Sequence, residues 1–329
     1  MRLSVFSLKA CFRVLMAVTW LVLGASGCTQ DGEMDFGGHA HALVGGQPAQ
    51  ADVFDAVVAL VASIGDKRIV YCSGTLIAPD IVLTAAHCLT GDETLDVPLL
   101  LETGRVHVVS GRHVDDVGAG VWPVADFRVH PDYVVGERHD DLALIRLPEP
   151  SGIAPWGLGD HPASVSDAVM MAGFGDDGDG VSGQRSVTSA QIDFACERPS
   201  GTCQTLVDDR RVYVPANAFV HLYRGSGTCF GDSGGPVFVE SDGGMQVVGV
   251  HARVDGTCRL YSISVSTWPY ADWFRDAWHE DVSCSAAVRK KAHFGGYMGY
   301  VLAGMAILCL KRLRKKRRRH GVSDACGVR

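Results

Sequence analysis

Ser233 is the residue of this chain whose surroundings best suit covalent chemistry. It lies in the stretch 231–236, which reads Gly-Asp-Ser-Gly-Gly-Pro. Glycines beside a nucleophilic serine let the backbone and a substrate approach closely. The backbone N–H groups of Gly231 and Ser233 could stabilise the oxyanion that forms during acyl transfer. A serine between glycines can also be only a turn, so its role depends on what else the chain supplies.

A nucleophilic serine needs a general base and a group that orients this base. His87 is a candidate base and lies in the stretch 83–88, Leu-Thr-Ala-Ala-His-Cys. Asp140 and Asp141 open the stretch 140–147, Asp-Asp-Leu-Ala-Leu-Ile-Arg-Leu, and a carboxylate there could hold the imidazole in the productive tautomer. A lone histidine is usually a surface or core residue, and a lone aspartate is usually a solvated loop residue.

These three stretches together resemble the nucleophile, histidine and aspartate motifs of the trypsin/chymotrypsin-like serine proteases. The aspartate motif of that family reads Asp, apolar, Ala, Leu, which selects Asp141 over Asp140. The order His87, Asp141, Ser233 is also that of the family, whereas subtilisins and α/β-hydrolases order the three groups differently. The resemblance implies that His87 is the general base, that Asp141 orients it, and that Ser233 attacks the substrate.

The secondary-structure elements that must position His87, Asp141 and Ser233 are short. Apolar runs alternate with turn residues at 57–61, 106–110, 142–147, 169–172, 212–214, 245–250 and 261–265. Many short strands without helical periodicity predict an all-β sandwich or barrel. In the stretch 268–278, apolar residues recur at three- and four-residue steps, which predicts one C-terminal helix. The resemblance covers about residues 43–280 and implies two six-stranded antiparallel barrels, about 43–155 and 156–281, with the active site between them.

The chain has eleven cysteines. An even set of six inside the folded region suggests three disulfides and an oxidising compartment. The resemblance implies the pairs Cys72–Cys88, Cys196–Cys203 and Cys229–Cys258, and Cys284 is then left over. Zinc is the alternative, but the sequence has no CxxC pair or close Cys/His cluster, so we expect no metal and no cofactor.

The stretch 43–46, Leu-Val-Gly-Gly, resembles the sequence at which zymogens of the family are cut. Cleavage after Ala42 would free the Leu43 amine, which the resemblance pairs with Asp232, and this pairing shapes the oxyanion hole. We therefore predict a propeptide, 29–42, and an activating protease that cuts after Ala42. Because Ala precedes the cut, a trypsin-like activator is not indicated. The alternative is an uncut loop with a glycine turn.

The resemblance assigns six residues to the specificity pocket: Gly227, Thr228, Phe230, Ala252, Arg253 and Val254. No carboxylate lies at the pocket floor, Gly227, so a preference for Arg or Lys at P1 is disfavoured. Val254 replaces a glycine of the family and would narrow the entrance, which favours small or apolar P1 residues. Ala252 removes a serine hydroxyl that supports the triad aspartate in the family. Arg259, in a shortened segment, could approach the pocket and allow acidic P1 residues.

Both ends of the chain resemble targeting segments. Three basic residues precede the uncharged run 14–23, which has the length of a signal-peptide core, so we predict a signal peptide over 1–28. Small residues before Cys28 fit either lipidation of that cysteine or ordinary cleavage nearby. After a linker, 282–293, the uncharged segment 294–310 is just long enough to span a membrane.

The tail 311–329 begins with nine residues of which eight are basic, so it should stay on the cytoplasmic side and the catalytic domain should face outward. The end of the chain is then either a membrane anchor or a sorting tail that is removed after delivery. Residues 43–281 contain 15 Lys and Arg against 33 Asp and Glu. An acidic domain repels phosphate backbones, so we expect no nucleic-acid binding.

These observations predict a secreted or cell-envelope serine endopeptidase. It would hydrolyse peptide bonds of protein or peptide substrates through an acyl-enzyme, with His87, Asp141 and Ser233 as its triad. The alternative is a catalytically silent homologue that acts as a binding protein. An esterase would share the triad but not the complete set of motifs.

Overall fold

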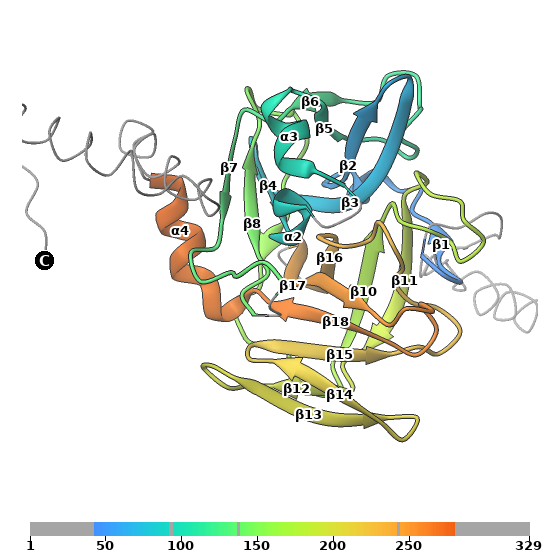
Figure 1. The fold of residues 1–329 in the computed structure, drawn as a ribbon, viewed down its shortest axis with the longest axis vertical. Coiled ribbons are helices and arrows are strands. Elements are labelled where there is room, and N and C mark those ends of the chain that lie inside the picture. Colours follow the sequence, from blue (N-terminus) through green and yellow to red (C-terminus); the bar gives the residue numbers. More distant parts are fainter. Residues whose placement is uncertain (1–42, 92–94, 137–138, 242–243, 280–329) are drawn as a thin grey trace, which may run out of the picture.

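The computed structural model describes residues 43–91, 95–136, 139–241 and 244–279. Strands dominate this part of the chain, and a short helix closes it (Figure 1). The predicted signal peptide with Cys28, the propeptide, Cys284, the linker, the segment 294–310 and the basic tail lie outside the described residues. None of the helices within the described ranges has the length and apolar character that a membrane span requires.

The first sheet has seven strands: β2 (Val57–Ile64), β3 (Lys67–Ala78), β4 (Ile81–Thr84), β5 (Val106–Val109), β6 (Val121–Pro123), β7 (Asp126–Val129) and β8 (Ala143–Arg146). They are antiparallel, in the order β6-β5-β2-β3-β4-β8-β7. β2 and β3 form a hairpin in which Ile64 pairs with Lys67, so its loop is Gly65 and Asp66. Gly65 has a φ of +59°, which suits such a two-residue loop.

The second sheet contains nine strands: β1 (Gln47–Pro48), β9 (Gly157–Leu158), β10 (Ala168–Gly173), β11 (Ser186–Gln191), β12 (Phe194–Cys196), β15 (Ala218–Leu222), β16 (Pro236–Ser241), β17 (Gly244–Val254) and β18 (Tyr261–Ser266). Eight follow the order β1-β11-β10-β16-β17-β18-β15-β12, and β9 pairs with β17 in parallel. A separate hairpin joins β13 (Thr202–Val207) to β14 (Arg210–Pro215). In Figure 1 the first sheet lies above the second.

The prediction of a mostly β domain is confirmed, but the strand numbers differ from six in each half. The two sheets have seven and nine strands, because the two-residue segments β1 and β9 extend the second sheet. These segments carry no apolar run of their own and owe their hydrogen bonds to the longer strands beside them. The β13/β14 hairpin pairs only with itself.

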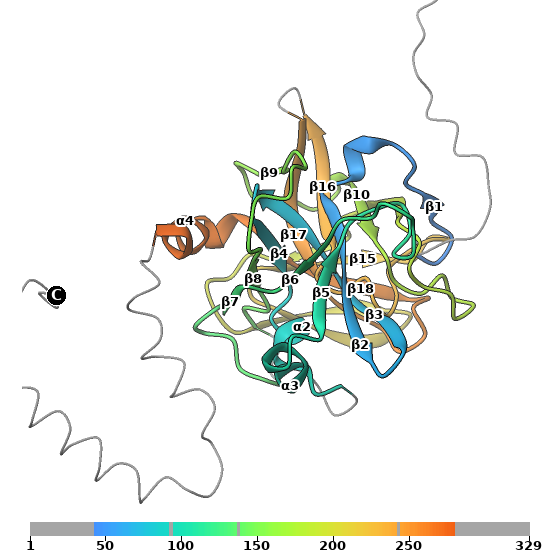
Figure 2. The ribbon, with the colours of Figure 1, turned by 90° about the horizontal axis from the view of Figure 1, so that it is seen from above.

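Helices are few and short: η1 (Asp52–Phe54), α2 (His87–Thr90), α3 (Val97–Glu102), η2 (Trp268–Tyr270) and α4 (Ala271–His279). The predicted C-terminal helix is confirmed, with a first turn that is 3₁₀ rather than α. Phe274 and Ala277 of α4 are buried at a spacing of three residues, as an amphipathic helix requires. Figure 2 shows α4 standing to one side of the sheets.

One apolar core joins the two sheets. Phe238 of β16 packs against Phe54 and Trp156, with ring centroids 6.1 Å and 4.6 Å away. Trp156 Nε1 also donates a hydrogen bond to the Val53 carbonyl at 3.0 Å. Burial of one such side chain contributes about 1.5–3 kcal/mol. This shared core fixes the two sheets relative to each other.

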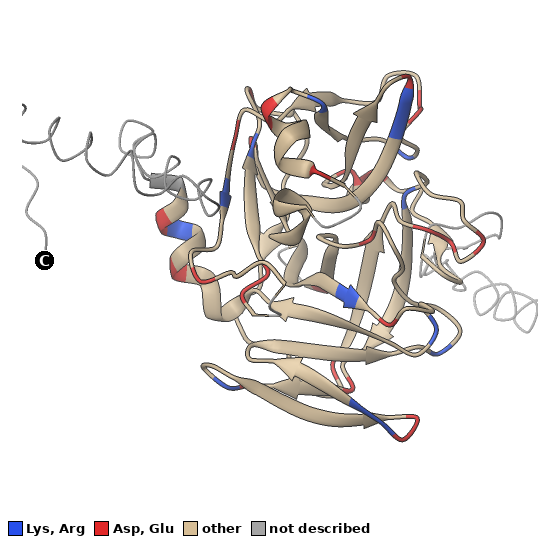
Figure 3. Ribbon diagram, in the orientation of Figure 1, with Lys and Arg blue, Asp and Glu red and all other residues tan. Residues whose placement is uncertain are grey.

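A buried arginine ties the N-terminal segment to the second sheet. Most charged residues lie in loops and at strand ends (Figure 3), but Arg185, just before β11, is fully buried. Its Nη1 lies 2.7 Å from Asp55 Oδ1, and its Nε and Nη2 donate to the Ala49 carbonyl at 3.1 Å and 3.0 Å. These bonds tie residues 49–55 to the start of β11, and the pairing with Asp55 offsets part of the cost of desolvating the guanidinium.

Candidate active site

His87 and Asp141 lie at the same end of two paired strands. β4 and β8 are antiparallel, with Thr84 opposite Ala143, so the residue after β4 meets the residue before β8. The Nδ1 atom of His87 lies 2.8 Å from Asp141 Oδ2, and the backbone N–H of His87 donates to Asp141 Oδ1 at 2.9 Å. Because a carboxylate only accepts, Nδ1 carries the proton and Nε2 is left as the basic nitrogen.

This carboxylate is buried, whereas the ring that it orients is accessible. The Asp141 side chain is 6% exposed and the His87 side chain is 34% exposed. A nearly dry carboxylate with two hydrogen bonds to one residue holds the imidazole in a single orientation. Asp140 points elsewhere, because its Oδ1 accepts a hydrogen bond from the Tyr270 hydroxyl at 2.7 Å.

The loop that carries Ser233 is docked on the first sheet. The backbone N–H of Ser73 in β3 donates to the Ser233 carbonyl at 2.7 Å. Gly234 has a φ of +82°, and a Cβ atom there would lie 2.1 Å from Thr84 Oγ1. Only glycine fits this position, so the sequence around Ser233 is what lets the loop approach the strands next to His87.

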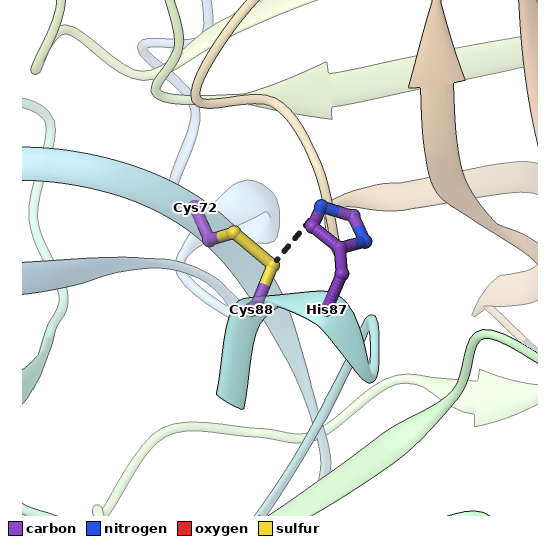
Figure 4. A group of neighbouring side chains, drawn as sticks. All are labelled: Cys72, His87 and Cys88. Carbon is purple, nitrogen blue, oxygen red and sulfur yellow. Dashed lines mark hydrogen bonds between the residues drawn. A yellow bond between two sulfur atoms is a disulfide. The ribbon is translucent and has the colours of Figure 1, made fainter. Parts of the chain in front are cut away.

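Cys88 of the Cys72–Cys88 disulfide contacts both the imidazole and the main chain of Ser233. Figure 4 shows Cys88 Sγ against the His87 ring, at 3.8 Å from Nε2. The same sulfur atom is 3.6 Å from the Ser233 carbonyl oxygen. The Nε2 atom of His87 and the carbonyl oxygen of Ser233 therefore both contact Cys88 Sγ. Cys72, His87 and Cys88 lie close together, contrary to the expectation of no Cys/His cluster, but the two sulfurs are bonded to each other and offer no thiolate for a metal.

Gly231 has a fixed orientation with its N–H available. Its φ is +94°, which favours glycine. The Phe230 carbonyl, in the same peptide unit as the Gly231 N–H, accepts from the Asp176 N–H at 2.7 Å, so the Gly231 N–H points the opposite way. Within the described ranges, the N–H groups of Gly231 and Ser233 donate to no protein acceptor. They remain free for an oxyanion.

The Ser73 side chain holds the other peptide unit of Gly231. Its hydroxyl donates to the Gly231 carbonyl at 2.9 Å and accepts from the Phe174 N–H at 3.0 Å. Ser73 is fully buried, and its carbonyl accepts from Thr84 Oγ1 at 2.8 Å. Ser73 was not predicted from the sequence, because one serine after a cysteine carries no recognisable signal.

The start of the described chain is packed into the second half of the molecule. Leu43 is fully buried, and the carbonyl of Val44 accepts from the Gly227 N–H at 2.9 Å. Asp232 is also fully buried, and its carboxylate accepts from the N–H groups of Gly175 and Cys229, each at 2.8 Å. Burial raises the pKa of Asp232 to about 7. In the described part of the intact chain, no cation pairs with this carboxylate.

The residues assigned to the specificity pocket lie on two walls. Gly227 and Thr228 are buried on one wall, where Phe230 is 63% exposed. The other wall is the end of β17, with Ala252, Arg253 and Val254 half-buried. The Cys229–Cys258 disulfide joins the walls, and Val254 packs beside it. A bulge between His251 and Arg253 changes the direction of β17 at this point.

Arg259 does not line the cavity next to these walls. A Cβ atom built on Gly178 would lie 3.6 Å from Arg259 Nη2, so the guanidinium lies against the loop between β10 and β11. The cause is Asp255, whose Oδ1 accepts from the backbone N–H groups of Arg259 and Leu260 at 3.0 Å and 2.8 Å. The suggestion that Arg259 recognises an acidic P1 residue is therefore not supported.

The structure contains the three disulfides that the resemblance implies: Cys72–Cys88, Cys196–Cys203 and Cys229–Cys258. Two buried histidines near the pocket, His221 and His251, were not predicted. Neither stands in a motif, and only cross-strand pairing brings them close to the site.

Two joined β-sheets, a histidine held by a buried carboxylate and a glycine-flanked serine loop are together typical of serine hydrolases. Comparison with known families assigns residues 43–274 to the Trypsin family. The chain belongs to this family.

Three relatives have a similar domain. The trypsin of Saccharopolyspora erythraea is 31% identical over 228 residues, which are 66% of this chain and 88% of that protein. The trypsin-like protease of Streptomyces glaucescens is 31% identical over 66% of this chain and 74% of its own. The brachyurin of Leptuca pugilator is 32% identical over 174 residues, 51% of this chain and 70% of its own. The family indicates a serine protease.

Proposed function

We propose that the chain is a serine endopeptidase with Ser233 as nucleophile, His87 as general base and Asp141 as the group that orients His87. The observation that carries this proposal is the pair of hydrogen bonds, 2.8 Å and 2.9 Å, by which Asp141 fixes His87. The docking of the Ser233 loop on the strands next to His87 supports it. A binding protein would not need this arrangement.

The reaction uses each group in turn. The Ser233 hydroxyl oxygen attacks the carbonyl carbon of the scissile bond, and its proton passes to His87 Nε2. The N–H groups of Gly231 and Ser233 stabilise the oxyanion. The C–N bond then breaks, and His87 gives its proton to the leaving amine. Water attacks the resulting ester by the same steps, and this releases the acid and restores the Ser233 hydroxyl.

Cleavage after Ala42 would activate the chain. The intact chain buries the Asp232 carboxylate with only two N–H donors, and burial raises its pKa to about 7. A new Leu43 amine would give this carboxylate a cation. The burial of Leu43 and the bond from Gly227 to Val44 support a location of the new terminus near the nucleophile loop. The activator would be a protease that accepts Ala before the cut.

The substrates that fit are proteins or peptides without Arg or Lys at P1. Gly227 stands where a carboxylate would be needed, and no acidic residue lines the adjacent cavity. Val254 beside the Cys229–Cys258 disulfide would narrow the entrance and suits small or apolar P1 residues. The inner end of the pocket, however, is polar.

The catalytic domain would work outside the cytoplasm. Its three disulfides are typical of extracellular proteins. The signal peptide 1–28, the span 294–310 and the basic tail 311–329 would deliver it and hold or sort it at the membrane, with lipidation of Cys28 as an alternative anchor.

Hydrolysis of an unfolded protein by the chain that starts at Leu43 tests the proposal. We expect internal cleavage, identified from the masses of the fragments. The Ser233→Ala variant, purified in the same way, should leave the substrate intact. Equal cleavage by the two proteins would assign the activity to a contaminant or another site, and no cleavage by either would contradict the proposed activity.

A further inference from the structure

A small cavity lies beside the wall of the specificity pocket. Its lining includes Met171, His221, Tyr223, Gly227, Thr228 and Ser262. Thr228 lies five residues before Ser233 on the nucleophile loop, and Cys258 of the wall disulfide also borders the cavity. Gly227 and Thr228 thus belong both to the lining of this cavity and to the residues assigned to the specificity pocket.

Strand register brings two histidines to one face of the second sheet. His221 of β15 pairs with Ser262 of β18, and His251 of β17 pairs with Ser264 of the same strand. Paired residues of an antiparallel sheet share a face, and so do residues two apart in a strand. All four side chains therefore lie on one side of the sheet.

The main chain of His251 is bonded directly to the loop that carries the nucleophile. The N–H of Gly234 donates to the His251 carbonyl at 2.8 Å, and the N–H of His251 donates to the Gly235 carbonyl at 2.9 Å. The histidine face is thus attached to the residues that follow Ser233.

Three buried polar atoms near this cavity have no hydrogen-bond partner among the described residues. They are Nε2 of His221, Nε2 of His251 and Oγ1 of Thr228, and the three residues are only 2%, 2% and 3% exposed. Nearly all buried polar atoms of folded proteins are paired, because an unpaired one is costly. His221 and Thr228 line the cavity, so a polar group of a ligand there could pair with them, and His251 lies on the same face of the sheet.

The hydrogen bonds of the two histidine rings determine which kind of ligand could bind in the cavity. His221 Nδ1 lies 3.1 Å from the carbonyl of Gln191, which only accepts, so the ring proton is on Nδ1 and the neutral ring presents a bare Nε2. His251 Nδ1 lies 3.1 Å from the Ser264 hydroxyl. Burial lowers the pKa of His221 to about 4 and that of His251 to about 3. Both rings are thus neutral at pH 7.

A ligand carboxylate bound in the cavity would change the protonation of His221 and His251. The Asp193 carboxylate favours the charged form of His221, but it is already paired with Arg224 at 2.9 Å. A positive charge on His221 also disfavours one on His251, so only one of the two rings would be protonated. The phenol of Tyr223 also borders the cavity. A buried carboxylate would therefore bind together with one proton, accepting one hydrogen bond from an imidazolium N–H and one from the Thr228 hydroxyl.

We propose that this cavity is the inner end of the specificity pocket and that His221, His251 and Thr228 select glutamate at P1. The inference rests on the proposed endopeptidase function and replaces the preference for apolar P1 residues expected from Val254. An apolar side chain would leave all three polar atoms unpaired, whereas the long glutamate side chain can carry a carboxylate past Val254 to them.

Peptide substrates that differ only at P1 test the proposal on the chain that starts at Leu43. We expect kcat/KM for glutamate to exceed that for glutamine, leucine and alanine by about tenfold or more. Thr228→Val, which removes one hydroxyl at nearly constant volume, should lower kcat/KM for glutamate by about tenfold and should affect leucine and alanine much less. Thr75→Val is the matched control, because Thr75 of β3 also has a buried, unpartnered hydroxyl.

The pH dependence gives a second readout. Since glutamate binds with a proton, its kcat/KM relative to alanine should fall as pH rises above about 6, and the same ratio for glutamine should not change. Equal cleavage after glutamate and leucine, or a Thr228→Val variant that slows all substrates alike, would overturn the inference and leave the endopeptidase intact.

Binding to the Ser233→Ala variant measures the pocket without catalysis. Peptides that end in glutamate should bind about tenfold more tightly than the same peptides ending in leucine, by calorimetry. Equal affinity would overturn the inference even if the wild-type chain cleaved nothing, and absence of all cleavage would contradict the proposed function separately.

Discussion

Asp141 is the residue that determines the orientation of His87. An amide in its place could offer an N–H to the ring and select the wrong tautomer, so Asp141→Asn should lower kcat by about 10⁴-fold. Asp140→Asn is the matched control, because the neighbouring carboxylate bonds to Tyr270 instead. Steady-state kinetics on a peptide substrate compare the two. Similar losses in both variants would contradict the role of Asp141.

In the proposed mechanism, Ser73 positions the oxyanion hole through its hydrogen bond to Gly231. Ser73→Ala leaves the Gly231 carbonyl and the Phe174 N–H without their partner, so the unfolding free energy should fall by about 1–3 kcal/mol. Because Gly231 becomes less well oriented, kcat should fall by about tenfold while KM changes little.

Thr75→Val, on the same strand, controls for the removal of a buried hydroxyl and should change neither kinetic constant. Thermal unfolding and kinetics are measured on the same preparations. A loss of stability in Ser73→Ala with an unchanged kcat would show that the bond serves folding alone.

The proposed cleavage after Ala42 would change the protonation of Asp232. In the intact chain the pKa of Asp232 is raised to about 7, above its usual value of about 3.9, so the folded state binds the extra proton. The contribution of Asp232 to the free energy of unfolding should therefore be largest below pH 4 and should fall by roughly 2–4 kcal/mol as pH rises to 7.

The chain that starts at Leu43 should not show this loss, because its new amine stabilises the charged carboxylate. Urea unfolding between pH 4 and 8 of both forms, each with Ser233→Ala to prevent autolysis, makes the comparison. The intact Asp232→Asn variant should also lose the pH dependence. Parallel pH profiles of the intact and cleaved forms would refute the pairing.

The disulfides differ in how much they should contribute to stability and to activity. Replacing Cys72 and Cys88 by alanine opens a 16-residue separation next to His87, and should cost about 2–4 kcal/mol together with most of the activity. Cys196–Cys203, with a separation of only 7 residues, joins β12 to the outlying β13/β14 hairpin. Its removal should reduce stability less and leave kcat unchanged. Denaturant melts and kinetics distinguish the pairs.

For the whole molecule, the sequence was most informative where chemistry demands neighbouring residues of defined type. The motifs around His87, Asp141 and Ser233 each lie in one short stretch, and the structure brings the His87 and Asp141 stretches into hydrogen-bond contact. The apolar runs likewise predicted β2, β5, β8, β17 and β18. These features are local, so periodicity and motif could reveal them.

Features that arise from pairing across the fold could not be predicted. Most residues of β11 and β13 are exposed or half-buried and show no regular apolar side, and β1 and β9 are too short to carry a pattern. Ser73, His221 and His251 acquire their surroundings from strands distant in sequence. Their positions follow from register, and one residue of shift would move each side chain to the opposite face.

A fluorophosphonate probe tests the central claim that two halves of the fold activate one serine. We expect the chain that starts at Leu43 to gain one probe mass, located on Ser233 by fragmentation, and Ser233→Ala and the uncut chain to gain little or none. Absence of labelling in the Leu43 form, or labelling of another serine, would contradict the catalytic assignment.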